Sequence, residues 1–102
     1  MNRWKIPASL ETEIRERDKH CIYCGTLFGS RPGKGSLASW EHIVNDAKII
    51  TRENIALCCC SCNSSKGTKT LADWLKSDYC VRRGIDNERI ADVVKLSLRT
   101  SA

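Results

Sequence analysis

Two C-x-x-C pairs constrain this chain more than any other feature of its sequence. Cys21 and Cys24 form the first pair, Cys59 and Cys62 form the second, and residues 25–58 separate them. Four thiolates at this spacing suit a tetrahedral zinc ion, and a site with four sulfur ligands leaves no coordination position for water. The pattern therefore predicts a structural zinc site that ties two distant segments together.

The other cysteines leave the choice of ligands open at one point. Cys58 could in principle replace Cys59, although only Cys59 forms C-x-x-C with Cys62. We therefore prefer Cys59, and we expect Cys58 and Cys60 to be small apolar residues at the end of a strand. Cys80 is isolated in the sequence, and we expect it to be buried or half-buried.

The cysteine count also bears on the cellular compartment. Seven is an odd number, which argues against a closed set of disulfides, and no charged segment followed by an apolar stretch lies near Met1. In a reducing compartment, clustered cysteines are more often metal ligands than bridges. We therefore expect a cytoplasmic protein of bacterial or phage origin. We expect no membrane span, because no apolar run approaches the roughly 20 residues that a spanning helix needs.

Length and composition predict one small domain over residues 1–102. A chain of 102 residues that is 41% hydrophobic has too little apolar material for two cores, and a domain of this size gains from a staple such as zinc. Lysine and arginine outnumber aspartate and glutamate by 17 to 12, which gives a net charge of +5. This excess favours a polyanionic partner without requiring one.

Hydrophobic spacing predicts an α+β fold. Two short apolar runs predict antiparallel strands, and apolar residues at helical spacing predict helices before and after them. The predicted elements are a helix from Ser9 to about Arg17, strands over 39–44 and 54–59, a helix over 60–66 ended by Gly67, a helix from Leu71 to about Ser77, and a last helix from Asp86 or Asn87 to about Arg99. Residues 70–102 are expected to complete the core or to supply a dimer surface.

A carboxylate and a histidine, Glu41 and His42, are neighbours between the two cysteine pairs. Neighbouring side chains on a strand point to opposite faces unless the strand ends or bulges there. Taken alone, such a pair is more often an ordinary surface feature than a site. Two asparagines give it a context, because Asn54 opens the next predicted strand and Asn63 directly follows Cys62.

The order of these motifs resembles that of the HNH endonuclease family. In that family a C-x-x-C pair precedes a strand with an acid and a histidine, an asparagine opens the second strand, and C-x-x-C-N-x-x-K-G leads into a helix. All of these pieces occur here in order over residues 21–67, whereas residues 70–102 carry no family motif. The resemblance implies a ββα-metal unit in a treble-clef-like, zinc-stabilised frame with flanking helices.

The resemblance also implies the roles of individual residues. His42 matches the first letter of the family name, Asn54 the second and Asn63 the third, where asparagine departs from the name but is similar to a common variant. His42 would activate water, since a neutral imidazole with a pKa near 6.5 can take a proton at physiological pH. Glu41 and Asn63 would ligate one Mg²⁺ or Mn²⁺ ion that stabilises the departing 3′ oxygen. Asn54 would support the loop that carries His42.

The expected activity is hydrolysis of DNA phosphodiester bonds, with 5′-phosphate and 3′-hydroxyl products. No recognition helix or specificity domain is evident in so short a chain, so we expect weak sequence preference. One such site cuts one strand for each binding event, which favours nicking by a monomer or weak homodimer. Arg52 and Lys66 are the predicted phosphate contacts, although either could be a solvated charge.

Two other classes of function remain open at this stage. A non-catalytic zinc module that binds nucleic acid or protein would not need Glu41, His42 or Asn63, and the presence of all three favours catalysis. A thiol-redox protein would use the cysteines over 58–62 as reactive thiols, which would leave one C-x-x-C pair unexplained. The zinc content of the protein separates the redox hypothesis from the other two.

Overall fold

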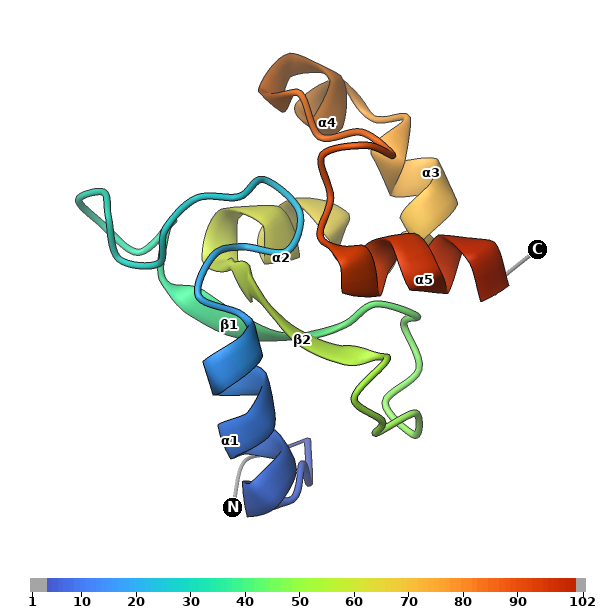
Figure 1. Cartoon of the computed structure of the whole chain (residues 1–102). Coiled ribbons are helices and arrows are strands. Elements are labelled where there is room, and N and C mark those ends of the chain that lie inside the picture. The colour runs from blue at the N-terminus through green and yellow to red at the C-terminus, as the bar shows by residue number, and fades with distance from the viewer. Residues whose placement is uncertain (1–3, 101–102) are drawn as a thin grey trace.

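The computed structural model describes residues 4–100, and a two-stranded antiparallel sheet lies at the centre of that part of the chain (Figure 1). β1 (Ala38–His42) pairs with β2 (Ile55–Cys59) in a register that runs from Ala38 opposite Cys59 to His42 opposite Ile55. The helices are α1 (Ala8–Arg17), α2 (Cys60–Lys66), α3 (Leu71–Leu75), α4 (Asp78–Arg83) and α5 (Asp92–Thr100). The fold is a small α+β arrangement, as the sequence predicts.

Alternation along the two strands gives the hairpin two faces. The α1 face carries Trp40, His42, Ile55 and Leu57, and the α2 face carries Ser39, Glu41, Ala56 and Cys58. Ile6 and Ile14 pack on the α1 face, whereas the main core, which includes Trp74, covers the α2 face. In Figure 1, α1 and α2 lie on opposite sides of the hairpin. All five residues of β2 are consequently buried.

Helix α2 begins and ends where the sequence predicts. At its start, the Sγ atom of Cys59 accepts a hydrogen bond from the backbone N–H of Cys62 at 3.4 Å. At its end, Gly67 adopts a φ of 52°, a left-handed conformation that favours glycine and stops the helix. Asn63 and Lys66 therefore lie on one short helix that starts at the cysteine pair.

The C-terminal helices differ from the prediction in number and in bounds. A helix forms within the predicted range 71–77, as α3, and it is followed by α4, a helix that was not predicted. The hydroxyl groups of Thr70 and Ser77 each accept a backbone N–H bond three residues later, so each caps its own helix start. Helix α5 begins at Asp92, later than predicted, because the carboxylate of Asp86 accepts two backbone N–H bonds and forms a turn instead.

The N-terminal elements lie close to their predicted bounds. Helix α1 begins directly after Pro7, whose fixed φ and missing N–H suit that position, rather than at a Ser9 cap. Strand β1 ends at His42, before the predicted end, because the next segment turns toward the side chain of Asn54. The backbone N–H of Val44 donates to the Oδ1 atom of Asn54 at 2.7 Å. This contact fixes the chain direction directly after His42.

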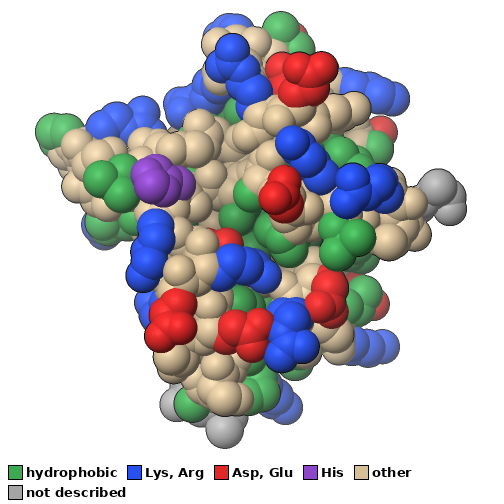
Figure 2. All heavy atoms as spheres, viewed as in Figure 1, with side chains coloured by type: hydrophobic (Ala, Val, Ile, Leu, Met, Phe, Trp, Pro, Cys, Tyr) green, Lys and Arg blue, Asp and Glu red, His purple; other side chains and the backbone are tan. Residues whose placement is uncertain are grey.

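The surface seen in Figure 2 carries lysine and arginine side chains that are spread over the whole view. Acidic side chains lie between them, so this face has no single strongly basic patch. Within residues 4–100, every helix is too short or too polar to cross a lipid bilayer.

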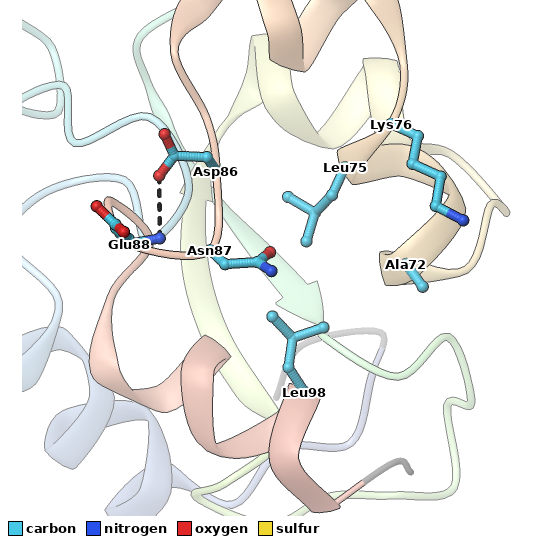
Figure 3. Close-up of a pocket in the computed structure, with 7 residues that line it drawn as sticks. All are labelled: Ala72, Leu75, Lys76, Asp86, Asn87, Glu88 and Leu98. Carbon is cyan, nitrogen blue, oxygen red and sulfur yellow. Dashed lines mark hydrogen bonds between the residues drawn. The ribbon is translucent and has the colours of Figure 1, made fainter.

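A hollow of about 560 Å³ lies between α3, the turn after α4, and α5 (Figure 3). Its lining residues are Ala72, Leu75, Lys76, Asp86, Asn87, Glu88 and Leu98. None of these belongs to the cysteine pairs, and Glu41, His42 and Asn63 do not line it. This hollow is therefore separate from the predicted site.

Candidate functional site

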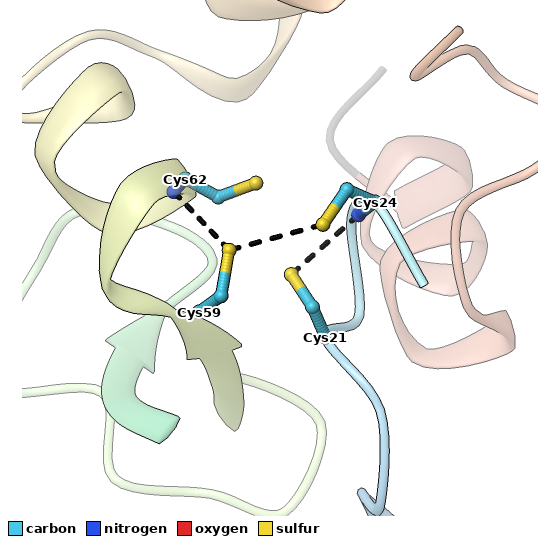
Figure 4. Close-up of side chains that lie close together, drawn as sticks. All are labelled: Cys21, Cys24, Cys59 and Cys62. Atoms are coloured by element: carbon cyan, nitrogen blue, oxygen red, sulfur yellow. Dashed lines mark hydrogen bonds between the residues drawn. The ribbon is translucent and has the colours of Figure 1, made fainter. Parts of the chain in front are cut away.

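The four cysteines of the two C-x-x-C pairs converge at the start of α2 (Figure 4). The Sγ atoms of Cys21, Cys24, Cys59 and Cys62 all lie within 4.8 Å of one another, and those of Cys24 and Cys59 are 3.8 Å apart. Four sulfurs about 2.3 Å from a tetrahedral zinc ion would be about 3.8 Å apart. The cluster is thus consistent with a structural zinc site, and it contains Cys59 rather than Cys58.

Backbone hydrogen bonds shape both pairs before any metal is considered. In each pair the N–H of the second cysteine donates to the Sγ atom of the first, from Cys24 to Cys21 at 3.5 Å and from Cys62 to Cys59 at 3.4 Å. Gly25 closes the first turn with a φ of 77° and donates to the Cys21 carbonyl at 3.0 Å. N–H groups aimed at sulfur favour the thiolate form, which is the form that binds zinc.

Hydrogen bonding among the sulfurs also changes their acidity. The thiol of Cys21 is the largest influence on Cys24 and Cys59, lowering the pKa of both and bringing that of Cys59 to about 6. Hydrogen bonds to the other sulfurs of the quartet raise the pKa of Cys21 and of Cys62. Zinc binds cysteine as thiolate, so a zinc ion bound here would displace the thiol protons that these sulfurs share.

One side chain outside the quartet contacts a sulfur. The hydroxyl of Tyr79 donates to the Sγ atom of Cys62 at 3.3 Å and lies 3.2 Å from the hydroxyl oxygen of Ser61. Outer hydrogen bonds of this kind orient metal ligands. Burial is the largest influence raising the pKa of Tyr79, so its hydroxyl stays a donor. No motif in the sequence pointed to this residue.

The remaining cysteines differ in burial. Cys58 and Cys80 are fully buried, and Cys60 is half-buried. Burial raises the pKa of Cys58, and the nearby carboxylate of Glu41 raises it further. A thiol with a raised pKa is a poor nucleophile. Cys58 and Cys80 are therefore packing residues here and offer little to a redox role.

Glu41 is buried on the α2 face and has two partners. Its Oε2 atom accepts a hydrogen bond from the hydroxyl of Tyr23 at 2.5 Å and lies 3.1 Å from Nζ of Lys66. Tyr23 lies between the two cysteines of the first pair, and Lys66 is the last residue of α2. Burial and the charge of Glu41 raise the pKa of Tyr23, which keeps the phenol protonated as a donor. The carboxylate is thus held from both segments that the cysteines join.

The structure does not support the predicted phosphate contact of Lys66. The side chain is 1% exposed, and its ammonium also donates to the carbonyl oxygens of Ile43 at 3.1 Å and His42 at 3.4 Å. A buried lysine needs such partners, because an unpaired charge in the interior is very costly. The sequence contained a signal for this position, since residues three apart on a helix share a face, which puts Lys66 beside Asn63.

Asn63 faces the same side of the hairpin as Glu41. Its Nδ2 atom donates to the hydroxyl of Ser39 at 2.6 Å, and Ser39 precedes Glu41 by two residues on β1. Both contacts of Glu41 use Oε2, and Asn63 uses its nitrogen. The Oε1 atom of Glu41 and the Oδ1 atom of Asn63 are therefore the hard oxygen donors on this face, and their chemistry suits Mg²⁺ or Mn²⁺.

His42 lies on the other face, next to the N-terminal segment. The ring of Trp4 meets the imidazole edge to face with centroids 5.0 Å apart, and His42 is only 7% exposed. Within residues 4–100, its Nε2 is the one buried side-chain nitrogen or oxygen without a hydrogen bond. Burial is the main cause that lowers the pKa of His42, and the charge of Lys66 lowers it as well, against the effect of Glu41. The imidazole is therefore neutral at physiological pH.

Asn54 fastens the loop that follows His42. Its Oδ1 accepts from the N–H of Val44 at 2.7 Å, and its Nδ2 donates to the carbonyls of Val44 at 3.2 Å and Ile49 at 3.1 Å. The backbone adds a bond from Ile43 N–H to the Asn54 carbonyl at 3.0 Å. Asn54 therefore acts on the backbone beside the imidazole and not on the imidazole itself.

Arg52 lies at the surface and is paired within the chain. Its guanidinium contacts both carboxylate oxygens of Glu13 on α1, at 2.6 and 3.1 Å, while its side chain stays 63% exposed. The hydrogen bond between the two side chains, together with their opposite charges, raises the pKa of Arg52 and lowers that of Glu13. An exposed pair of this kind contributes little to stability and is easily exchanged for another anion.

Comparison with known proteins gives no further guide. No protein-family model, no curated protein and no solved structure matches this chain. Function must therefore be inferred from the residues and their geometry. The structure pairs Glu41 with Lys66 on the α2 face, where Asn63 bonds to Ser39, and it places His42 on the α1 face beside Trp4.

Proposed function

We propose that this chain is a zinc-stabilised, HNH-type endonuclease that nicks DNA, with His42 as general base and one Mg²⁺ or Mn²⁺ ion on the opposite face of β1. The observation that carries the proposal is the neutral imidazole of His42 with a buried Nε2 that has no hydrogen-bond partner. Buried polar atoms almost always have partners, so an orphan calls for an explanation. A general base that accepts a proton from a water molecule supplies one.

The opposite orientation of Glu41 and His42 supports this proposal. Among residues 4–100, β1 has a strand partner on one edge only, and the two side chains project from opposite faces of that edge strand. Displacement at phosphorus requires the attacking and departing oxygens to lie roughly in line on opposite sides of the phosphorus atom. A phosphate bound along the free edge of β1 would meet the base from one side and the metal ligands from the other.

The residues then divide the work. His42 takes a proton from the attacking water, and Asn54 keeps the backbone beside it fixed. Glu41 and Asn63 would hold the divalent ion, which supplies positive charge to the phosphate and the departing 3′ oxygen. With zinc bound, the four cysteines would fix α2 against the hairpin and so keep Asn63 on the same face as Glu41. Such a division of roles would match the ββα-metal arrangement that the resemblance implies.

Access to His42 requires one local movement. The ring of Trp4 covers the imidazole, and Ile6 anchors the same segment in the core of the α1 face. For water and phosphate to reach Nε2, the indole has to leave the imidazole while Ile6 can remain in place. The described conformation is thus a closed form of the site.

The partner is proposed to be DNA, bound with weak sequence preference. The net charge of +5 favours a polyanion, and basic side chains are spread over the face in Figure 2 without a concentrated patch. Contacts of this kind go to phosphate groups and carry no sequence information. Arg52 can join them by exchanging Glu13 for a phosphate.

The test is plasmid nicking by the zinc-loaded protein with Mg²⁺ or Mn²⁺. We expect wild type to convert supercoiled plasmid to nicked circles, and His42→Ala to lose at least about 10²-fold in rate, as expected for a lost general base. His20→Ala is the matched control, because His20 is the other histidine and is exposed. Equal rates for wild type and His42→Ala would overturn the proposal, as would no nicking by protein with a full complement of zinc.

A non-catalytic zinc module that binds nucleic acid or protein is the second candidate. The observation that favours it is the pairing of Glu41 with Lys66, which neutralises the proposed metal ligand in the closed form. This candidate predicts salt-dependent DNA retention in a gel-shift assay without any nicking in the same buffer. The two assays together separate the candidates.

A further inference from the structure

An oxygen-rich position on the α2 face is filled by a side chain of the protein itself. The Nζ atom of Lys66 lies 3.1 Å from Oε2 of Glu41 and 3.1 and 3.4 Å from the carbonyl oxygens of Ile43 and His42. A carboxylate and two backbone carbonyls are the donors that surround hard cations in proteins. Here an ammonium takes that position, and the side chain that carries it is 1% exposed.

The surroundings bind this ammonium firmly. Tyr23 donates to the same Oε2 atom at 2.5 Å, so one oxygen of Glu41 serves both partners. All three hydrogens of the ammonium have an oxygen within reach, which satisfies a buried lysine. Lys66 is therefore not free to swing outward to a phosphate without leaving the Glu41 carboxylate buried and unpaired.

The same charge acts on any second cation that approaches Glu41. Like charges a few ångströms apart repel strongly where water is excluded, and the ammonium already neutralises the carboxylate. A divalent ion would meet one carboxylate oxygen, one amide oxygen of Asn63 and a neighbouring positive charge. Mg²⁺ and Mn²⁺ bind such sites poorly unless a phosphate adds its own negative charge.

We propose that Lys66 is the resident cation of this site and that it keeps the free protein from holding a divalent ion on Glu41 and Asn63. Lys66 is then a positioning residue, which fixes Oε2 of Glu41 and leaves Oε1 for an ion that arrives with the phosphate. The last step, arrival of the ion with phosphate, rests on the proposed nuclease function. The exclusion of the ion from the free protein does not depend on that function.

The experiment measures Mn²⁺ binding to the zinc-loaded full chain without nucleic acid, from the electron paramagnetic resonance signal of free Mn²⁺. We expect Lys66→Gln to bind Mn²⁺ at least about tenfold more tightly than wild type, because a unit charge beside the ion is gone. Adding Glu41→Gln to Lys66→Gln should abolish the gain. Lys69→Gln is the matched control, since Lys69 is exposed and its ammonium bonds the Ser65 carbonyl, and the variant should bind Mn²⁺ as wild type does.

Two results would overturn the inference. One is equal Mn²⁺ affinity of wild type and Lys66→Gln, and the other is a gain that survives Glu41→Gln. Circular dichroism and zinc content establish that each variant is folded. If Lys66→Gln does not fold, wild type alone decides: Mn²⁺ binding that Glu41→Gln removes would contradict the inference, and no such binding would support it. None of these outcomes depends on plasmid nicking, so a failure of the nuclease proposal can be distinguished from a failure of this inference.

Discussion

The two ends of the β1–β2 hairpin are held together by different chemistry. At the cysteine end, where Ala38 pairs with Cys59, four sulfurs from two distant segments converge within 4.8 Å of one another. At the charged end, where His42 pairs with Ile55, the chain is held by neutral and ionic hydrogen bonds from Asn54 and Lys66. One end is organised to suit a single ion, and the other is organised by several side chains.

The two ends therefore depend on different interactions for their geometry. A zinc ion would fix the geometry of the cysteine end almost independently of the surrounding packing. At the charged end each partner matters by itself, because a lost partner leaves a buried polar group unsatisfied. Helix α2 links the two ends, since it contains Cys62 near its start and Lys66 at its last residue. The cysteine end can therefore influence how the charged end is oriented through this helix.

The largest effect is expected from removing a ligand at the cysteine end. Structural zinc contributes about 10–16 kcal/mol of binding free energy in small zinc domains, and folding draws on it. We expect Cys59→Ser to lose zinc and its cooperative unfolding transition. The matched change, Cys58→Ser, removes a buried thiol outside the quartet and should retain a full zinc ion. Zinc analysis and thermal unfolding measure both. Zinc loss in Cys58→Ser but not in Cys59→Ser would show that Cys58, and not Cys59, is the ligand.

The cysteine end was the part that sequence could predict well. C-x-x-C spacing is local, so the turn of Cys21 to Cys24 and the helix start at Cys59 to Cys62 follow from the residues themselves. Gly67 ends α2 for an equally local reason. Helix α4 was missed, although the hydroxyl of Ser77 is a local signal for its start.

A smaller but still large effect is expected at the charged end from Lys66→Met. Removing one partner of a buried ion pair typically costs about 3–5 kcal/mol, because the remaining charge stays buried. The double change Lys66→Met with Glu41→Gln should recover much of this loss, since no unpaired charge then remains. Urea unfolding at fixed zinc concentration measures the free energies. Additive losses in the double variant would show that the two side chains are not coupled.

The charged end could be predicted only in part. Adjacent positions of Glu41 and His42 on a strand imply opposite faces, and the structure has them there. Which face receives which helix depends on tertiary packing, so the sequence could not show that Lys66 reaches Glu41 or that Trp4 covers His42. Tyr23 was overlooked for the same reason, because its role depends on where β1 passes the first cysteine pair.

Asn54→Ala is expected to have an intermediate effect and to sharpen the contrast between the two ends. The change leaves the N–H of Val44 and the carbonyl of Ile49 without their side-chain partner, at about 1–3 kcal/mol for a buried group. Zinc content should not change, because the cysteine end is untouched. Asn45→Ala, at an exposed position in the same loop, is the control and should be close to neutral. Hydrogen exchange over residues 43–54 should rise only in Asn54→Ala, and zinc loss in that variant would contradict independent ends.

The smallest effect is a pH dependence that belongs to His42. Its pKa is lowered in the folded protein, mainly by burial, so the unfolded chain takes up a proton first as the pH falls. Stability is therefore lost as the pH falls below the unfolded value near 6.5 toward the folded value, with a slope of at most about 1.4 kcal/mol per pH unit. Acid also releases zinc, so the measurement is the difference between wild type and His42→Gln in urea unfolding.

Trp4→Ala tests whether the indole of Trp4 is the cause of the lowered pKa of His42. If the indole is what keeps water from the imidazole, its removal should raise the pKa of His42 toward 6.5. The slope of stability against pH should then decrease, while zinc binding should stay nearly unchanged. The His42 ring protons report the pKa directly by nuclear magnetic resonance. An unchanged pKa in Trp4→Ala would mean that the imidazole is desolvated by the hairpin itself. The closed form of the site would then not depend on the N-terminal segment, and opening the site would require a change in the hairpin.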